Sequence, residues 1–159
     1  MNAISHSLIA AATSGFDLKT AILARHAQHP VIVHFPIALF IMSAVFELLA
    51  VWRKQPLLAS VAYFNLLAAA ISIPFTIATG LAAWQLQLEG ATLKGNLRMH
   101  MIFAIVTATI IVVLFSKRYR LRMNGQPPRA GYFTLTLIGL MMITITGHFG
   151  GILSGVEAP

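Results

Sequence analysis

Four long apolar runs dominate this sequence and restrict the folds that it can adopt. A membrane-spanning helix needs roughly 17–25 predominantly apolar residues, so each run is long enough to cross a bilayer. Composition agrees, because 58% of the residues are hydrophobic and 9% are charged, against roughly 45–50% and about 25% in a soluble domain. We therefore expect an all-α integral membrane four-helix bundle with up-down-up-down topology. The runs cover about 31–52, 57–84, 99–115 and 131–153.

The rest of the chain divides around these runs. We expect a four-span transmembrane domain over 29–155, an N-terminal segment over 1–28 on the outer side, and a short C-terminal tail over 156–159. The N-terminal segment is expected to be a tail or an interfacial helix. Its part over 16–28 could lie along the outer surface of the membrane.

Basic residues between the runs predict the orientation. Cytoplasmic loops of membrane proteins carry an excess of Lys and Arg, so we expect the side with more of them in the cytoplasm and both termini in the periplasm of a Gram-negative host. The location would be the bacterial inner (cytoplasmic) membrane. The same distribution explains the net charge of +7 without a nucleic-acid partner. The richer side holds Arg53, Lys54, Lys117, Arg118, Arg120, Arg122 and Arg129, and the other holds Lys19, Arg25, Lys94 and Arg98.

Several kinds of chemistry are excluded by what the sequence lacks. It contains no cysteine, so it offers no disulfide, thiolate metal site, iron–sulfur ligation or covalently attached c-type haem. It also has no glycine-rich phosphate loop, no paired carboxylates and no nucleophile–base–acid set. The sequence therefore gives little support to a catalytic function. Whether the chain is an enzyme stays open, with a non-catalytic, cytochrome b-like subunit of an oxidoreductase as the expectation.

All six histidines fall at the outer end of the predicted bundle. His34 lies one turn into the first span, His100 opens the third, and His148 is near the outer end of the fourth. A rise of about 1.5 Å per residue puts these three at a similar shallow depth. An imidazole inside a membrane is costly unless it is ligated or hydrogen-bonded. We therefore predict that at least two of the three bind a ligand, whereas His6 and His26, in the tail, are simply wetted by headgroups.

Haem b is the leading candidate ligand, because its iron takes two axial imidazoles from facing helices. The first and third helices of such a bundle can face each other diagonally, so we pair His34 with His100. His148 and His29, which lies at the membrane boundary, form a second pair or serve as alternates. If the ligand is instead a metal ion, the hydrogen bonds that orient the ligating rings could come only from the backbone, Thr79, Thr146 or water.

Small and basic residues accompany the histidines. Gly80 and Gly147 lie in the same layer and would let the backbone approach a flat macrocycle, although ordinary helix packing explains them as well. Arg98, together with Lys94 and Arg25, could meet haem propionates at the outer surface.

Two other readings use the same residues. In one, His34, His100 and His148 bind zinc or copper, which accept neutral imidazoles. In the other, the chain is a structural membrane subunit without a cofactor. A calcium or magnesium site is not expected, because the histidine layer holds no carboxylate.

Glu47 is the one acidic residue inside the first span. We expect its side chain to reach the inner interface beside Arg53. The alternative is a proton path or a hydrogen bond to another helix, with Asn65 as its partner.

Four short motifs resemble one family of bacterial membrane proteins. HPVIVHFPIAL at 29–39 is the most specific, and ATG at 78–80, RMH at 98–100 and GHFGG at 147–151 accompany it. Over about 29–155 the chain resembles the four-helix proteins of domain-of-unknown-function family twenty-two thirty-one. The resemblance implies a four-span membrane domain. Relatives sometimes occur with Rieske or cytochrome c modules, which favours a redox role.

The expected function is therefore electron transfer by a membrane b-type haem-binding subunit, between quinol in the membrane and a periplasmic acceptor. The expected partners are the lipid bilayer, a quinone, and a periplasmic cytochrome or Rieske-type protein. A homo-oligomer is compatible with the small residues of the second span, at 68–70 and Ser72, which pack within the bundle or against another copy.

Overall fold

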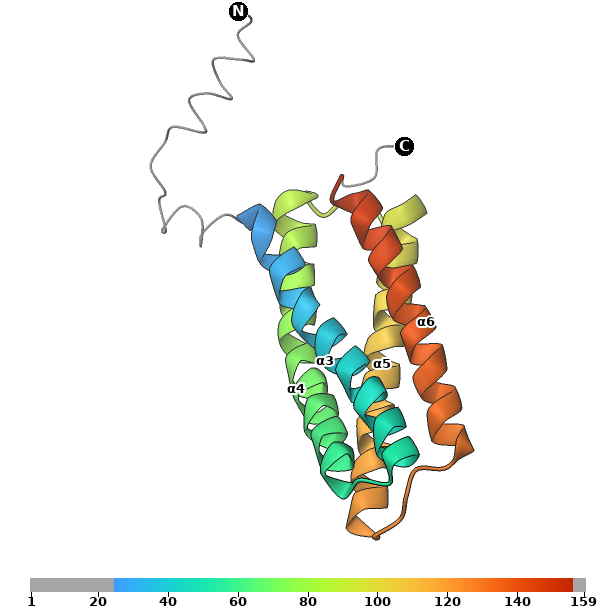
Figure 1. Cartoon of the computed structure of the whole chain (residues 1–159). Coiled ribbons are helices and arrows are strands. Elements are labelled where there is room, and N and C mark those ends of the chain that lie inside the picture. Colours follow the sequence, from blue (N-terminus) through green and yellow to red (C-terminus); the bar gives the residue numbers. More distant parts are fainter. Residues whose placement is uncertain (1–24, 156–159) are drawn as a thin grey trace, which may run out of the picture.

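The computed structural model describes residues 25–155, and this part of the chain is built from four helices without strands (Figure 1). Each helix is long and apolar enough to span a membrane. The expected all-α fold of a multi-pass membrane protein is thus confirmed. Most of the predicted N-terminal segment, and the tail over 156–159, lie outside the described residues. The helices are α3 (Arg25–Arg53), α4 (Pro56–Gln87), α5 (Gly95–Met123) and α6 (Ala130–Leu153).

All four helices extend beyond the apolar runs that predicted them, and two of them, α3 and α5, do so by more than one turn. α3 begins at Arg25, four residues before the expected transmembrane boundary. α5 continues through the basic stretch at 117–122 to Met123, because Lys and Arg are good helix formers even where the chain ceases to be apolar. At the start of α4, Pro56 occupies the first turn after Gln55, where its missing N–H group costs no hydrogen bond.

The helices form two antiparallel hairpins. In the first, His29 of α3 contacts Thr79 of α4, and further along Ser43 donates to the carbonyl of Ala62 over 2.9 Å. In the second, residues near the start of α5 contact residues near the end of α6. The first described residues and the end of α6 lie at one end of the bundle (Figure 1). We call this the histidine end, and the end with the α3–α4 and α5–α6 connections the basic end.

A small core joins the two hairpins. Phe40 of α3 is 1% exposed and packs beside Gly139 of α6, next to Ile110 of α5. A Cβ atom on Gly139 would lie 2.9 Å from Cζ of Phe40 and 3.0 Å from Cγ2 of Ile110, so glycine is what lets these helices approach. Ala69 of α4 is fully buried in the same core, which assigns at least this small residue to packing within the bundle.

Glu47 corrects the sequence analysis. Its carboxylate does not reach the interface beside Arg53, and Asn65 donates instead to the carbonyl of Val61 in its own helix. Glu47 is 2% exposed and accepts two hydrogen bonds from the Arg118 guanidinium, over 2.8 and 3.0 Å. A buried carboxylate requires such a partner. The expectation failed because Arg118 was placed in a loop, whereas it lies inside α5.

Candidate functional site: a histidine-lined cavity between the hairpins

A cavity of about 310 Å³ lies between the hairpins toward the histidine end and is lined by all four helices. Its size is at the lower limit of the roughly 300–1,000 Å³ that is typical of ligand pockets. Most of the lining is aliphatic, including Val33, Ile73 and Ile143, and two imidazoles, those of His29 and His100, face into it. An apolar cavity with a few convergent polar groups is the usual form of a ligand site.

The hydrogen bonds of His29 determine which ring nitrogen is available. Its Nδ1 lies 3.1 Å from the hydroxyl oxygen of Thr79. That hydroxyl also lies 3.1 Å from the carbonyls of Phe75 and Thr76, which can only accept. When the single hydroxyl proton is donated to one of these carbonyls, the Thr79 oxygen accepts from Nδ1 of His29, and Nε2 keeps its lone pair.

His100 is held in the same tautomer by a different acceptor. Its Nδ1 lies 3.1 Å from the backbone carbonyl of Thr146 in α6. A carbonyl cannot donate, so Nδ1 of His100 again carries the proton and Nε2 is the basic nitrogen. The Thr146 hydroxyl bonds Thr107 of α5 and the carbonyl of Met142, which holds this turn of α6 in place.

Glycine lies against each of the two rings. A Cβ atom on Gly80 would be 3.1 Å from Cε1 of His29, and one on Gly150 would be 3.3 Å from Cε1 of His100. Any larger residue would press on the ring, so both imidazoles depend on a neighbouring glycine for their positions. Gly147, which the sequence analysis placed in the site, borders open space instead.

The arrangement therefore presents two imidazoles from diagonal helices to one cavity. Both rings are partly buried and line the same cavity. Chemically, each Nε2 can ligate a metal centre, while each Nδ1–H is already paired with an oxygen. This is the usual condition of a ligating histidine, whose second nitrogen donates to a carbonyl, carboxylate or water.

His34 and His148 lie elsewhere. Both are exposed, and neither lines the cavity. Nδ1 of His34 is hydrogen-bonded to the carbonyl of Pro30, and the His148 ring meets that of Phe149 edge-on with centroids 5.9 Å apart. The sequence paired His34 with His100, whereas the structure brings His29 to His100. Within the described residues, no three His, Cys, Asp or Glu side chains are grouped so that they could hold a metal ion.

One cation of α5 lies on the side of the helix that faces the cavity. A helix turns by about 100° per residue, so positions seven apart share a face. Arg98 precedes the cavity-lining Ile105 by seven residues, so its exposed side chain is on the cavity side of α5, toward the histidine end. Lys94, also exposed, directly precedes α5 with an extended backbone and has no place on a helix face. The side chain of Arg25 lies outside the described part of the chain.

The sequence indicated most of these residues but did not predict which of them lie together around the cavity. Thr79 and Thr146 were expected as hydrogen-bonding partners. The structure pairs the Thr79 hydroxyl with His29, whereas His100 is bonded to the backbone carbonyl of Thr146 and not to its hydroxyl. The sequence could not show which of Gly147 and Gly150 lies against a histidine, because both belong to the GHFGG motif. The rotation of α6 about its axis decides it, and places Gly150 against His100.

The comparisons with known proteins agree with this architecture. The family described as "Predicted membrane protein (DUF2231)" matches residues 25–157. This match covers most of the chain, so the chain belongs to that family, as its sequence motifs indicated. Neither the curated proteins nor the solved structures include a match.

Proposed function

We propose that this member of the DUF2231 membrane-protein family binds a b-type haem in the cavity between its hairpins, with Nε2 of His29 and of His100 as the axial ligands. One observation carries the proposal: both rings face the same apolar cavity, and both have Nδ1 tied to an oxygen acceptor. A bis-histidine haem requires two protein ligands, whereas a structural zinc site requires four and a catalytic one three. Two paired imidazoles therefore favour haem over the bare zinc or copper ion of the alternative.

The surrounding residues have definite roles in this proposal. Aliphatic side chains from all four helices line the cavity and would surround the macrocycle. Thr79 and the Thr146 carbonyl would orient the rings and raise the basicity of each Nε2. Arg98, on the cavity side of α5, and Lys94, directly before this helix, would pair with the propionates. When bound, the haem would supply one-electron redox chemistry.

The membrane context supports electron transfer. We place the basic end in the cytoplasm and both termini in the periplasm, since positive loops stay inside. The up-down-up-down bundle then holds its haem near the periplasmic face of the bacterial inner membrane. There the protein passes electrons between membrane quinol and a periplasmic acceptor, such as a cytochrome or a Rieske-type protein.

An absorption spectrum tests the proposal. The detergent-purified chain, made with ample haem supply, should show sharp α and Soret bands after dithionite reduction. His29→Ala and His100→Ala should each lose these bands or convert them to a high-spin form, because one axial ligand is gone. His34→Ala and His148→Ala are matched controls at the same end of the bundle and should keep the wild-type spectrum.

Two results would contradict the proposal. A featureless spectrum of the folded wild-type chain would exclude a haem protein, and elemental analysis for zinc and copper would follow. Unchanged haem content and spectrum in both His29→Ala and His100→Ala would refute the ligand assignment.

A further inference from the structure

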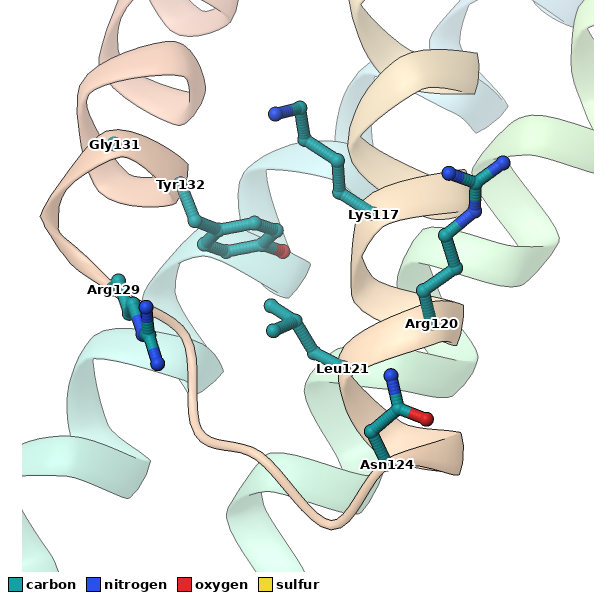
Figure 2. A pocket seen from close by; sticks show the side chains of 7 residues that line it. All are labelled: Lys117, Arg120, Leu121, Asn124, Arg129, Gly131 and Tyr132. Carbon is teal, nitrogen blue, oxygen red and sulfur yellow. The ribbon is translucent and has the colours of Figure 1, made fainter.

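A second cavity, of about 330 Å³, lies at the basic end between α5 and α6. Lys117 and Arg120 border it from α5, and Arg129 from the start of α6. Figure 2 shows Tyr132 and Leu121 between these cations, with Lys117 and Arg129 on different sides of the tyrosine ring. The pocket thus combines an apolar interior with three positive charges from two helices.

Three other basic side chains at this end, those of Arg53, Arg118 and Arg122, are already engaged. Arg118 is paired with Glu47, the Arg122 guanidinium lies 4.7 Å from the centroid of the Tyr63 ring, and that of Arg53 lies 4.6 Å from the centroid of the Trp52 ring. The three pocket cations have no such partner.

No carboxylate of the described chain neutralises the pocket. Within residues 25–155 the only ion pair is the one between Arg118 and Glu47. The other carboxylate in that range, Glu89, lies in the α4–α5 connection at the opposite end of the bundle. Uncompensated cations around a cavity attract an anion.

The position of the pocket along α5 indicates what kind of anion it binds. α5 has 29 residues and is therefore about 43 Å long, whereas the hydrocarbon core of a bilayer is about 30 Å thick. The apolar stretch of α5 ends at Phe115, so a membrane-spanning α5 would bring Lys117 and Arg120 to the level of the lipid headgroups. The buried ring of Tyr132 offers an apolar surface to the part of a lipid just below its phosphate.

We propose that this pocket binds the headgroup of an anionic phospholipid, with Lys117 and Arg120 of α5 and Arg129 of α6 as its cationic border. Basic pockets between transmembrane helices recognise such headgroups, and cations can form strong, charge-assisted hydrogen bonds to phosphate. The site is independent of any cofactor at the histidine end.

The test is a lipid titration of the detergent-purified full chain, with binding measured by native mass spectrometry. Phosphatidylglycerol should bind, and phosphatidylcholine should not compete. Each basic residue near an anionic lipid contributes about fivefold in affinity, so Lys117→Gln/Arg129→Gln should bind about 30-fold more weakly, and Lys117→Gln alone about fivefold. Both substituted side chains are exposed, so folding, checked by circular dichroism, should be unaffected.

Arg53→Gln/Lys54→Gln is the matched control, because it removes two cations from the same end outside the pocket. It should keep the wild-type affinity to within about twofold. Equal losses in the two double variants, or none in the pocket variant, would refute a specific site. If inorganic phosphate displaced phosphatidylglycerol at equal concentration, the ligand would be a soluble anion, and the lipid assignment would be wrong.

Discussion

At the scale of single residues, the tautomers of two histidines determine what this site can do. The Thr79 oxygen and the Thr146 carbonyl each accept a hydrogen bond from an Nδ1–H group, and the Nε2 atom of each ring then carries the lone pair. Only the first of these acceptors can be removed by mutation, because Thr79 accepts with its side chain and Thr146 with its backbone carbonyl.

Thr79→Val removes the acceptor of His29 while keeping the shape of the side chain. Loss of such an outer hydrogen bond typically costs about 10–100-fold in the affinity of a metal site. We therefore expect weaker haem binding in a titration of the apoprotein, with His29 still present. Thr144→Val is the control, since the exposed Thr144 makes the same type of bond to the carbonyl of Leu140 away from the cavity. Wild-type haem affinity in Thr79→Val would contradict the role given to this hydroxyl.

At the scale of helices, Gly139 sets how closely α6 packs on α3. In Gly139→Ala the new Cβ would meet Phe40 and Ile110, which are 1% and 9% exposed and have little room to move. Overpacking of this kind usually costs about 1–3 kcal/mol. The free energy of unfolding, measured by denaturant titration in detergent, should fall accordingly.

Gly147→Ala in the same helix serves as the control, because its Cβ would meet nothing within 4 Å. Alanine favours a helix over glycine by roughly 0.5–1 kcal/mol at either position, so the difference between the two variants isolates the contact. Equal stabilities would show that the α3–α6 contact tolerates the extra methyl group.

The sequence predicted the positions of the helices better than it predicted which side of each helix faces its neighbours. Four spans follow from length and hydropathy alone, so they could be read from the sequence. His29 and His34 are five residues apart, which rotates one by about 140° from the other around the helix axis. Depth along the membrane therefore could not decide which of them meets His100. Similarly, hydropathy ended the third span before Arg118, because charge and helix formation are separate properties.

At the scale of the whole molecule, α3 and α5 connect the two hairpins at both ends. His29 and His100 share the cavity, and Glu47 and Arg118 form the ion pair. Each pair is separated by 71 residues, as the sequence positions show. The two diagonal helices thus run parallel and in the same register along the bundle, so the ion pair at one end helps to fix the spacing of the histidines at the other.

Breaking the ion pair should destabilise the whole bundle. Glu47→Leu leaves the buried Arg118 without a partner, which typically costs about 3–5 kcal/mol. The double variant Glu47→Leu/Arg118→Leu removes both charges and should recover most of that loss. Unfolding of the two single variants and the double variant in detergent gives the coupling energy. A double variant as unstable as the sum of the two single variants would show that the charges act separately.

The Glu47–Arg118 pair also bears on how the protein is made. Each hairpin carries one of the two charges, so a nascent chain emerging from the ribosome contributes the acidic half well before the basic half. The carboxylate of the first hairpin therefore gains its partner only when the second hairpin has been made. The buried ion pair that joins the two halves of the bundle is thus among the last of its contacts that can form during synthesis.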